Sequence, residues 1–168
     1  TFTTDERAFM VREPILSKMA IGGHPVHPTL IHFPVAALIG VIGTDVGYLV
    51  THDEFWARAG LWLAGIGAFG GWIAGSIGLI DLLVVTRIRR LITAWSHAIL
   101  AVMMLSLATL NWLLRYTDAA AHIFPWGAYL SLLTGALIMA TGLLGGQLVY
   151  EYAIGVNTHE ALHRRVKP

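Results

Sequence analysis

The sequence is 168 residues long, 56% hydrophobic and only 12% charged, with a net charge of +1. A soluble domain carries about a quarter charged residues, so this composition excludes an ordinary soluble globular protein. There is no cysteine, which excludes disulfides, iron–sulfur clusters and thiolate metal sites. Any cofactor must be held by His, Met, Asp or Glu, or by packing.

The first 23 residues are expected to form a surface segment, because they begin polar and then alternate apolar with charged side chains. Four long apolar stretches follow, at 29–50, 57–85, 91–115 and 125–151. Each approaches or exceeds the roughly 20 residues that a helix needs to cross a bilayer. The sequence therefore predicts an all-α, integral membrane four-helix bundle over 24–156, followed by a short C-terminal helix or tail over 157–168.

Basic residues are concentrated on one side of the predicted bundle. Of the eleven lysines and arginines, only Arg58 and Arg115 follow the first or third span; the other nine lie before the first span, between the second and third, or after the fourth. Basic residues are enriched in cytoplasmic loops. This distribution predicts cytoplasmic termini and a multi-pass protein of the bacterial cytoplasmic (inner) membrane.

The motif HPVHPTLIHFP at 24–34 opens the first span with three histidines and three prolines. His24 and His27 precede prolines, which disfavour helix at the preceding residue, so we expect both on an extended lead-in. His32 lies inside the span, and a histidine inside a span is a candidate functional group. A stripe of small residues is predicted on the same helix side as His32.

Two acidic residues and a glycine repeat mark the first two spans. Asp45 is expected to reach the interface or to pair with a hydroxyl group. Asp81 falls near the end of the second span and is predicted to point into the bundle. Gly67, Gly71 and Gly75 recur every four residues, a pattern typical of close helix packing in membranes.

The third span places polar residues at a spacing of seven. His97, Met104 and Asn111 fall within a narrow arc, which predicts one inward face carrying potential ligands and hydrogen-bonding groups. His97 lies in the first two turns after the loop that contains Arg87 and Arg90. It should therefore lie at about the same depth as His32.

One hypothesis is that His32 and His97 are the axial ligands of one b-type haem. Two imidazoles on facing helices suit low-spin haem iron, and Arg87, Arg89 and Arg90 could neutralise the propionates. The chain would then be a membrane electron-transfer subunit that passes electrons between a quinone and a partner redox protein.

Two alternatives use the same residues. His24, His27 and His32, with His97, Asp81 or His159, could bind zinc, copper or non-haem iron. Otherwise the histidines bond backbone groups freed by the prolines, His97 pairs with Asp81, and the chain is a non-catalytic anchor or assembly subunit of a larger complex. No motif for hydrolytic catalysis or nucleic-acid binding is present.

The opening motif, the segment GLID at 78–81 and the segment GGQLVY at 145–150 resemble an uncharacterised family of predicted four-helix bacterial membrane proteins. The resemblance covers most of residues 22–156. It implies a redox setting, since members are associated with periplasmic cytochrome c or quinoprotein dehydrogenase modules. The residues that match the family pattern are His24, His27, His32, Asp81, His97 and Asn111.

Overall fold

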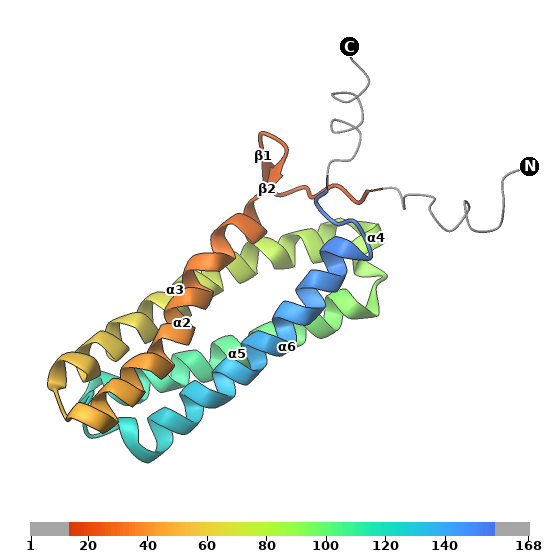
Figure 1. Ribbon diagram of the computed structural model, residues 1–168. Helices are drawn as coiled ribbons and strands as arrows, with labels where there is room; N and C mark the ends of the chain where they lie inside the picture. Colours follow the sequence, from red (N-terminus) through yellow and green to blue (C-terminus); the bar gives the residue numbers. More distant parts are fainter. Residues whose placement is uncertain (1–13, 157–168) are drawn as a thin grey trace, which may run out of the picture.

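The computed structural model describes residues 14–156 and contains four long helices, each antiparallel to the next one in the sequence (Figure 1). They are α2 (Val26–Thr51), α3 (Glu54–Val84), α5 (Ile92–Tyr116) and α6 (Ala128–Tyr150), the last preceded by η1 (Ile123–Gly127). All four are long and apolar enough to cross a membrane. The predicted all-α membrane bundle is confirmed; the predicted tail helix with His159 lies outside the described residues.

The order of the helices around the bundle places α2 and α5 on a diagonal. Helix α2 packs against α3 and α6, and α5 packs against the same two helices. Both α2 and α5 start at the end of the bundle that carries the short helix α4 (Thr86–Arg89) and run in the same direction (Figure 1). Inward side chains of α2 and α5 can therefore meet on the bundle axis.

Helix α2 begins earlier than its prolines suggest. It starts at Val26, so Pro28 lies in the first turn, where a missing N–H leaves no helical hydrogen bond unmade. It also continues through Pro34, which is buried against Gly70 of α3, where a Cβ atom would lie 3.5 Å from the proline ring. The expected start at residue 29 therefore moves to residue 26, and His27 becomes a helical residue.

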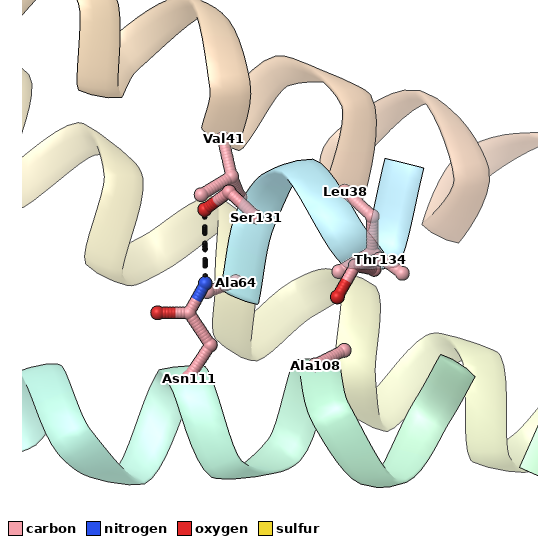
Figure 2. Close-up of a pocket in the computed structure, with 7 residues that line it drawn as sticks. All are labelled: Leu38, Val41, Ala64, Ala108, Asn111, Ser131 and Thr134. Atoms are coloured by element: carbon pink, nitrogen blue, oxygen red, sulfur yellow. Dashed lines mark hydrogen bonds between the residues drawn. The ribbon is translucent and has the colours of Figure 1, made fainter. Parts of the chain in front are cut away.

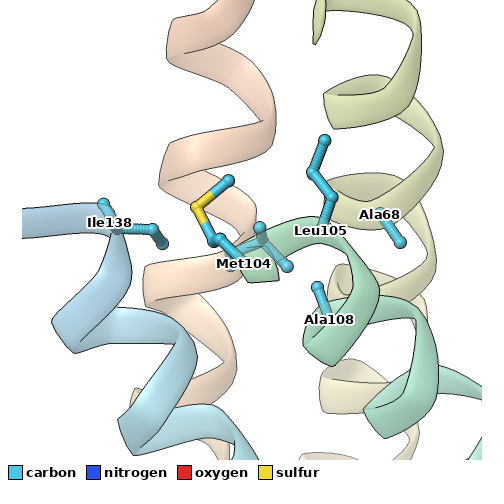
Figure 3. Close-up of a cluster of buried hydrophobic side chains, with 6 residues drawn as sticks. Ala68, Met104, Leu105, Ala108 and Ile138 are labelled. Carbon is cyan, nitrogen blue, oxygen red and sulfur yellow. The ribbon is translucent and has the colours of Figure 1, made fainter. Parts of the chain in front are cut away.

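Close packing of α3 depends on its glycines, as the spacing of four predicts. A Cβ atom on Gly67 would lie 2.5 Å from the Leu38 side chain, and one on Gly71 would overlap Leu105. These contacts lead into the central apolar cluster of the bundle (Figure 3). The cluster consists of Leu38, Ala68, Met104, Leu105, Ala108 and Ile138.

Both ends of the described chain meet at the α4 end of the bundle. The N–H of Ile15 donates to the Ala153 carbonyl at 3.1 Å, and the N–H of Gly155 donates to the Ile15 carbonyl at 2.8 Å. Between Ile15 and α2, strands β1 (Ala20–Ile21) and β2 (His24–Pro25) form a small hairpin. Its turn uses two glycines at positive φ, 57° and 81°, which suits a two-residue hairpin turn.

Candidate functional site: a histidine pair on the bundle axis

Two imidazoles lie close together, with their ring planes nearly perpendicular, across the diagonal of the bundle. The rings of His27, from the first turn of α2, and His97, from the second turn of α5, have centroids 6.4 Å apart and an interplanar angle of 87°. Both side chains are half-buried. Because α2 and α5 are diagonal, the pair lies between α3 and α6, at the end of the bundle that carries α4.

Each ring is oriented by a backbone carbonyl of the helix that follows it in the sequence. Nδ1 of His27 lies 2.7 Å from the Ala74 carbonyl oxygen of α3, and Nδ1 of His97 lies 2.9 Å from the Thr141 carbonyl oxygen of α6. A carbonyl oxygen only accepts, so Nδ1 is the donor in both rings. In the neutral imidazole the lone pair is then on Nε2, which is the arrangement found in metal-binding histidines.

A glycine lies beside each ring. A Cβ atom on Gly78 of α3 would lie 3.0 Å from Nδ1 of His27, and one on Gly145 of α6 would lie 3.3 Å from Cε1 of His97. A larger side chain at either position would have to displace the imidazole. Both glycines belong to the segments, GLID and GGQLVY, that carry the family resemblance.

His32 does not take part in this pair. The side chain is exposed on the outside of the bundle, so the prediction that His32 faces inward is wrong. His32 is five positions after His27, so its side chain is rotated by about 140° around the helix axis relative to that of His27. The stripe predicted beside His32 is also outward, since Ala36 and Gly43 are exposed. The histidine of the opening motif that lies beside His97 is His27.

Asp81 does not pair with His97 either. Its carboxylate accepts the Ser17 hydroxyl at 2.5 Å and the backbone N–H groups of Lys18 and Met19 at 2.8 and 3.1 Å. The prediction of an inward carboxylate is therefore corrected. Asp81 lies in the last turn of α3 and binds residues 17–19, which precede the hairpin.

The alternative of a small-ion site finds no cluster of ligands in the described chain. His24 is exposed in β2, with Nδ1 3.0 Å from the Gly22 carbonyl oxygen, and Asp81 is engaged as above. Within residues 14–156, no three His, Asp or Glu side chains are grouped so that they could hold a metal ion. Of the candidate ligands that lie within residues 14–156, the structure brings together His27 and His97.

A second cluster of polar side chains occupies the opposite end of the bundle, and its ion pair was not predicted from the sequence. Arg115 is fully buried and donates to both carboxylate oxygens of Asp45, at 2.5 and 2.8 Å. The expected hydroxyl partner of Asp45 is also present, since Ser131 donates to it at 2.7 Å. The positive-inside count placed Arg115 among the outer charges, whereas it is an internal ion pair.

Asn111 completes this network. Its side-chain oxygen accepts from Nε of Arg115 at 2.8 Å, and its amide donates to Ser131 at 2.9 Å (Figure 2). The buried hydroxyl of Thr134 lines the small adjoining cavity and has no hydrogen-bond partner among residues 14–156. Met104 is buried on the same inward face as Asn111, as predicted, and it packs in the apolar cluster between the histidine pair and the Arg115 network.

The same residue spacing occurs on α2 and on α5, a pattern that was not predicted from the sequence. His27 and Asp45 are 18 residues apart (45 − 27), and so are His97 and Arg115 (115 − 97). Eighteen residues make five helical turns, about 27 Å, so each pair lies on one side of its helix. Because α2 and α5 are parallel, the equal spacing pairs His27 with His97 and Asp45 with Arg115.

Comparison with known proteins supports the membrane assignment. The model of a family described as "Predicted membrane protein (DUF2231)" matches residues 23–158. The match spans all four long helices and includes both histidines of the pair and both residues of the buried ion pair. No curated protein and no solved structure matches the chain.

Proposed function

Because the chain belongs to the DUF2231 family of predicted membrane proteins and brings two imidazoles together inside its bundle, we propose that it is a membrane electron-transfer subunit. In this proposal one b-type haem would be held through His27 and His97. The single observation that carries it is the pair of adjacent imidazoles, each with Nδ1 bonded to a backbone carbonyl.

The two rings have the chemistry of ligands for one iron. With Nδ1 bonded to a carbonyl, each ring keeps Nε2 for a metal, and His27 and His97 are the residues that would hold the haem iron. Haem iron with two axial imidazoles is a common electron-transfer centre in helical bundles.

The surrounding residues have separate tasks in this proposal. The carbonyls of Ala74 and Thr141 fix the ring orientations and make Nε2 a more basic metal ligand. Arg87 and Arg90 lie on the loop at the same end of the bundle and would neutralise the propionates. A bound haem b would supply one-electron transfer, and the donor and acceptor would be a quinone and a separate redox protein at the membrane.

A visible spectrum of the detergent-purified full chain tests the proposal. We expect a reduced-minus-oxidised b-type α-band that is lost in His27→Ala and in His97→Ala. The control is His32→Ala, because His32 lies on the same helix but is exposed to the outside; this variant should keep the full band.

Two outcomes would overturn the proposal. One is a colourless protein with intact helical circular dichroism after expression with a haem precursor; the other is equal loss of the band in all three variants. A colourless chain without stoichiometric metal in elemental analysis would favour the alternative, a non-catalytic anchor or assembly subunit. The outward His32 beside Ala36 and Gly43 is the feature that favours this alternative, since small residues allow close helix contact in membranes.

A further inference from the structure

The loop between α3 and α5 exposes a compact basic surface. Helix α4 is a single turn in which Ile88 is buried, 5% exposed, in a cluster with Ile15, Leu82 and Ala94. With Ile88 anchored inward, Arg89 and Arg90 are exposed. The apolar residue thus fixes the turn, and the guanidinium groups are left at the surface of the bundle end.

The described part of the chain offers these arginines no acidic partner. Neither the Arg58–Glu54 nor the Arg115–Asp45 ion pair of the described residues involves Arg89 or Arg90. The Arg89 guanidinium makes one hydrogen bond to a described residue, to the Leu83 carbonyl at 3.3 Å, although a guanidinium has five N–H donors. Asp81, the acidic residue closest in sequence, is already bonded to the segment 17–19.

The position of the loop fixes the environment of these charges. Helices α3 and α5 both have the length and hydropathy of membrane spans, so we expect the turn that joins them at the membrane surface. Trp95 is partly exposed and its indole N–H donates to the Arg89 carbonyl at 2.9 Å. Tryptophan is enriched at this level of the membrane, and Ile92, 83% exposed, marks the start of the apolar region.

We propose that Arg89 and Arg90, together with the exposed Lys18, bind the phosphate of an anionic glycerophospholipid. A guanidinium can bind a phosphate through two parallel hydrogen bonds, and basic residues next to a span attract anionic lipids. The other end of the bundle has no equivalent site among the described residues: its exposed Arg58 is paired with Glu54. This inference does not depend on the histidine pair or on a bound haem.

The test measures lipid retention by the full chain. The protein is placed in nanodiscs that contain equal amounts of phosphatidylglycerol and phosphatidylcholine, extracted into detergent, and analysed by native mass spectrometry. We expect selective retention of phosphatidylglycerol, and a reduction of about 30-fold in its apparent affinity in the double variant R89Q/R90Q, about five-fold for each charge. The matched control R58Q should retain phosphatidylglycerol as the unmodified protein does.

Three results would overturn the proposal. Retention could be unchanged in R89Q/R90Q while circular dichroism shows the same fold, or R58Q could lose the lipid equally. Inorganic phosphate at the same concentration could also bind as tightly as the lipid, which would make the site one for a soluble anion.

Discussion

Arg115 illustrates how a charged residue can be accommodated inside a membrane bundle. Its guanidinium donates hydrogen bonds to three side chains: Asp45 on α2, Ser131 on α6, and Asn111 one turn earlier on α5. Space for the guanidinium comes from Gly60 and Gly127, where a Cβ atom would lie 3.1 and 2.9 Å from its nitrogens. The ion pair thus connects three helices at the end opposite the histidines.

Replacing one partner of this ion pair should strongly destabilise the protein. In Arg115→Met the Asp45 carboxylate keeps the Ser131 hydroxyl but loses its counter-ion, and we expect a loss of about 3–5 kcal/mol of unfolding free energy. The measurement is reversible unfolding in mixed micelles. Arg58→Met is the control, because the exposed Arg58–Glu54 pair contributes about 0–1 kcal/mol.

A double variant separates the charge from the shape of Arg115. Asp45→Leu combined with Arg115→Met removes both charges, so no uncompensated ion remains, and it should recover part of the stability lost in Arg115→Met. If the double variant is less stable than Arg115→Met alone, the network rather than the unpaired carboxylate accounts for the loss.

The residues of the site were only partly predictable. His97 and the inward face it shares with Asn111 followed from helical spacing, because the boundaries of the third span were nearly correct. His27 was predicted only as a ligand of an alternative metal site and not as the neighbour of His97. The rule for residues before proline assigned it to an extended segment, whereas Pro28 is tolerated in the first turn of α2. Asp81 was misplaced because its partners, residues 17–19, were assigned to a surface segment, and the sequence does not show that this segment contacts the end of α3.

Among the helices, α3 is the one whose packing the sequence described best. Its glycines recur on the side that α2 and α5 cover, and their spacing alone predicted close contact. The spacing does not tell which glycines are tightly enclosed. In α6, by contrast, Gly142 is exposed and a Cβ atom there would have nothing within 4 Å.

This difference predicts opposite effects for two similar substitutions. Gly67→Ala places a methyl group against Leu38 and should cost about 1–3 kcal/mol of unfolding free energy. Gly142→Ala should be neutral or stabilising by up to about 1 kcal/mol, since alanine favours helix over glycine. Thermal unfolding in one detergent compares the two variants, and equal midpoints would contradict the packing described for α3.

The whole molecule consists of two similar helical hairpins, α2–α3 and α5–α6. In each hairpin the first helix carries a histidine whose Nδ1 bonds a carbonyl of the second helix, and the second helix places a glycine beside that ring. The histidines therefore meet on the axis that relates the two halves. At the other end of that axis the halves differ, since one contributes Asp45 and the other Arg115, so the pair there is an ion pair instead of two like groups.

The two ends of the bundle also differ in exposed charge, which predicts how the protein is oriented. With Arg115 buried against Asp45, the exposed basic residue described at the far end is Arg58, already paired with Glu54. Lys18, Arg89 and Arg90 are exposed at the end where the described chain ends meet. Because basic residues favour the cytoplasmic side, this end should face the cytoplasm.

Single-cysteine labelling can check this orientation, since the chain contains no cysteine. Ile21→Cys lies on the hairpin at the basic end, where Ile21 is 75% exposed, and Thr117→Cys lies just beyond α5 at the far end. In intact bacterial cells a membrane-impermeant maleimide should label Thr117→Cys, whereas Ile21→Cys should react only after the cells are permeabilised. Both variants must react in detergent. The reverse pattern in intact cells would place the histidine pair and the arginines of α4 on the outer side of the membrane.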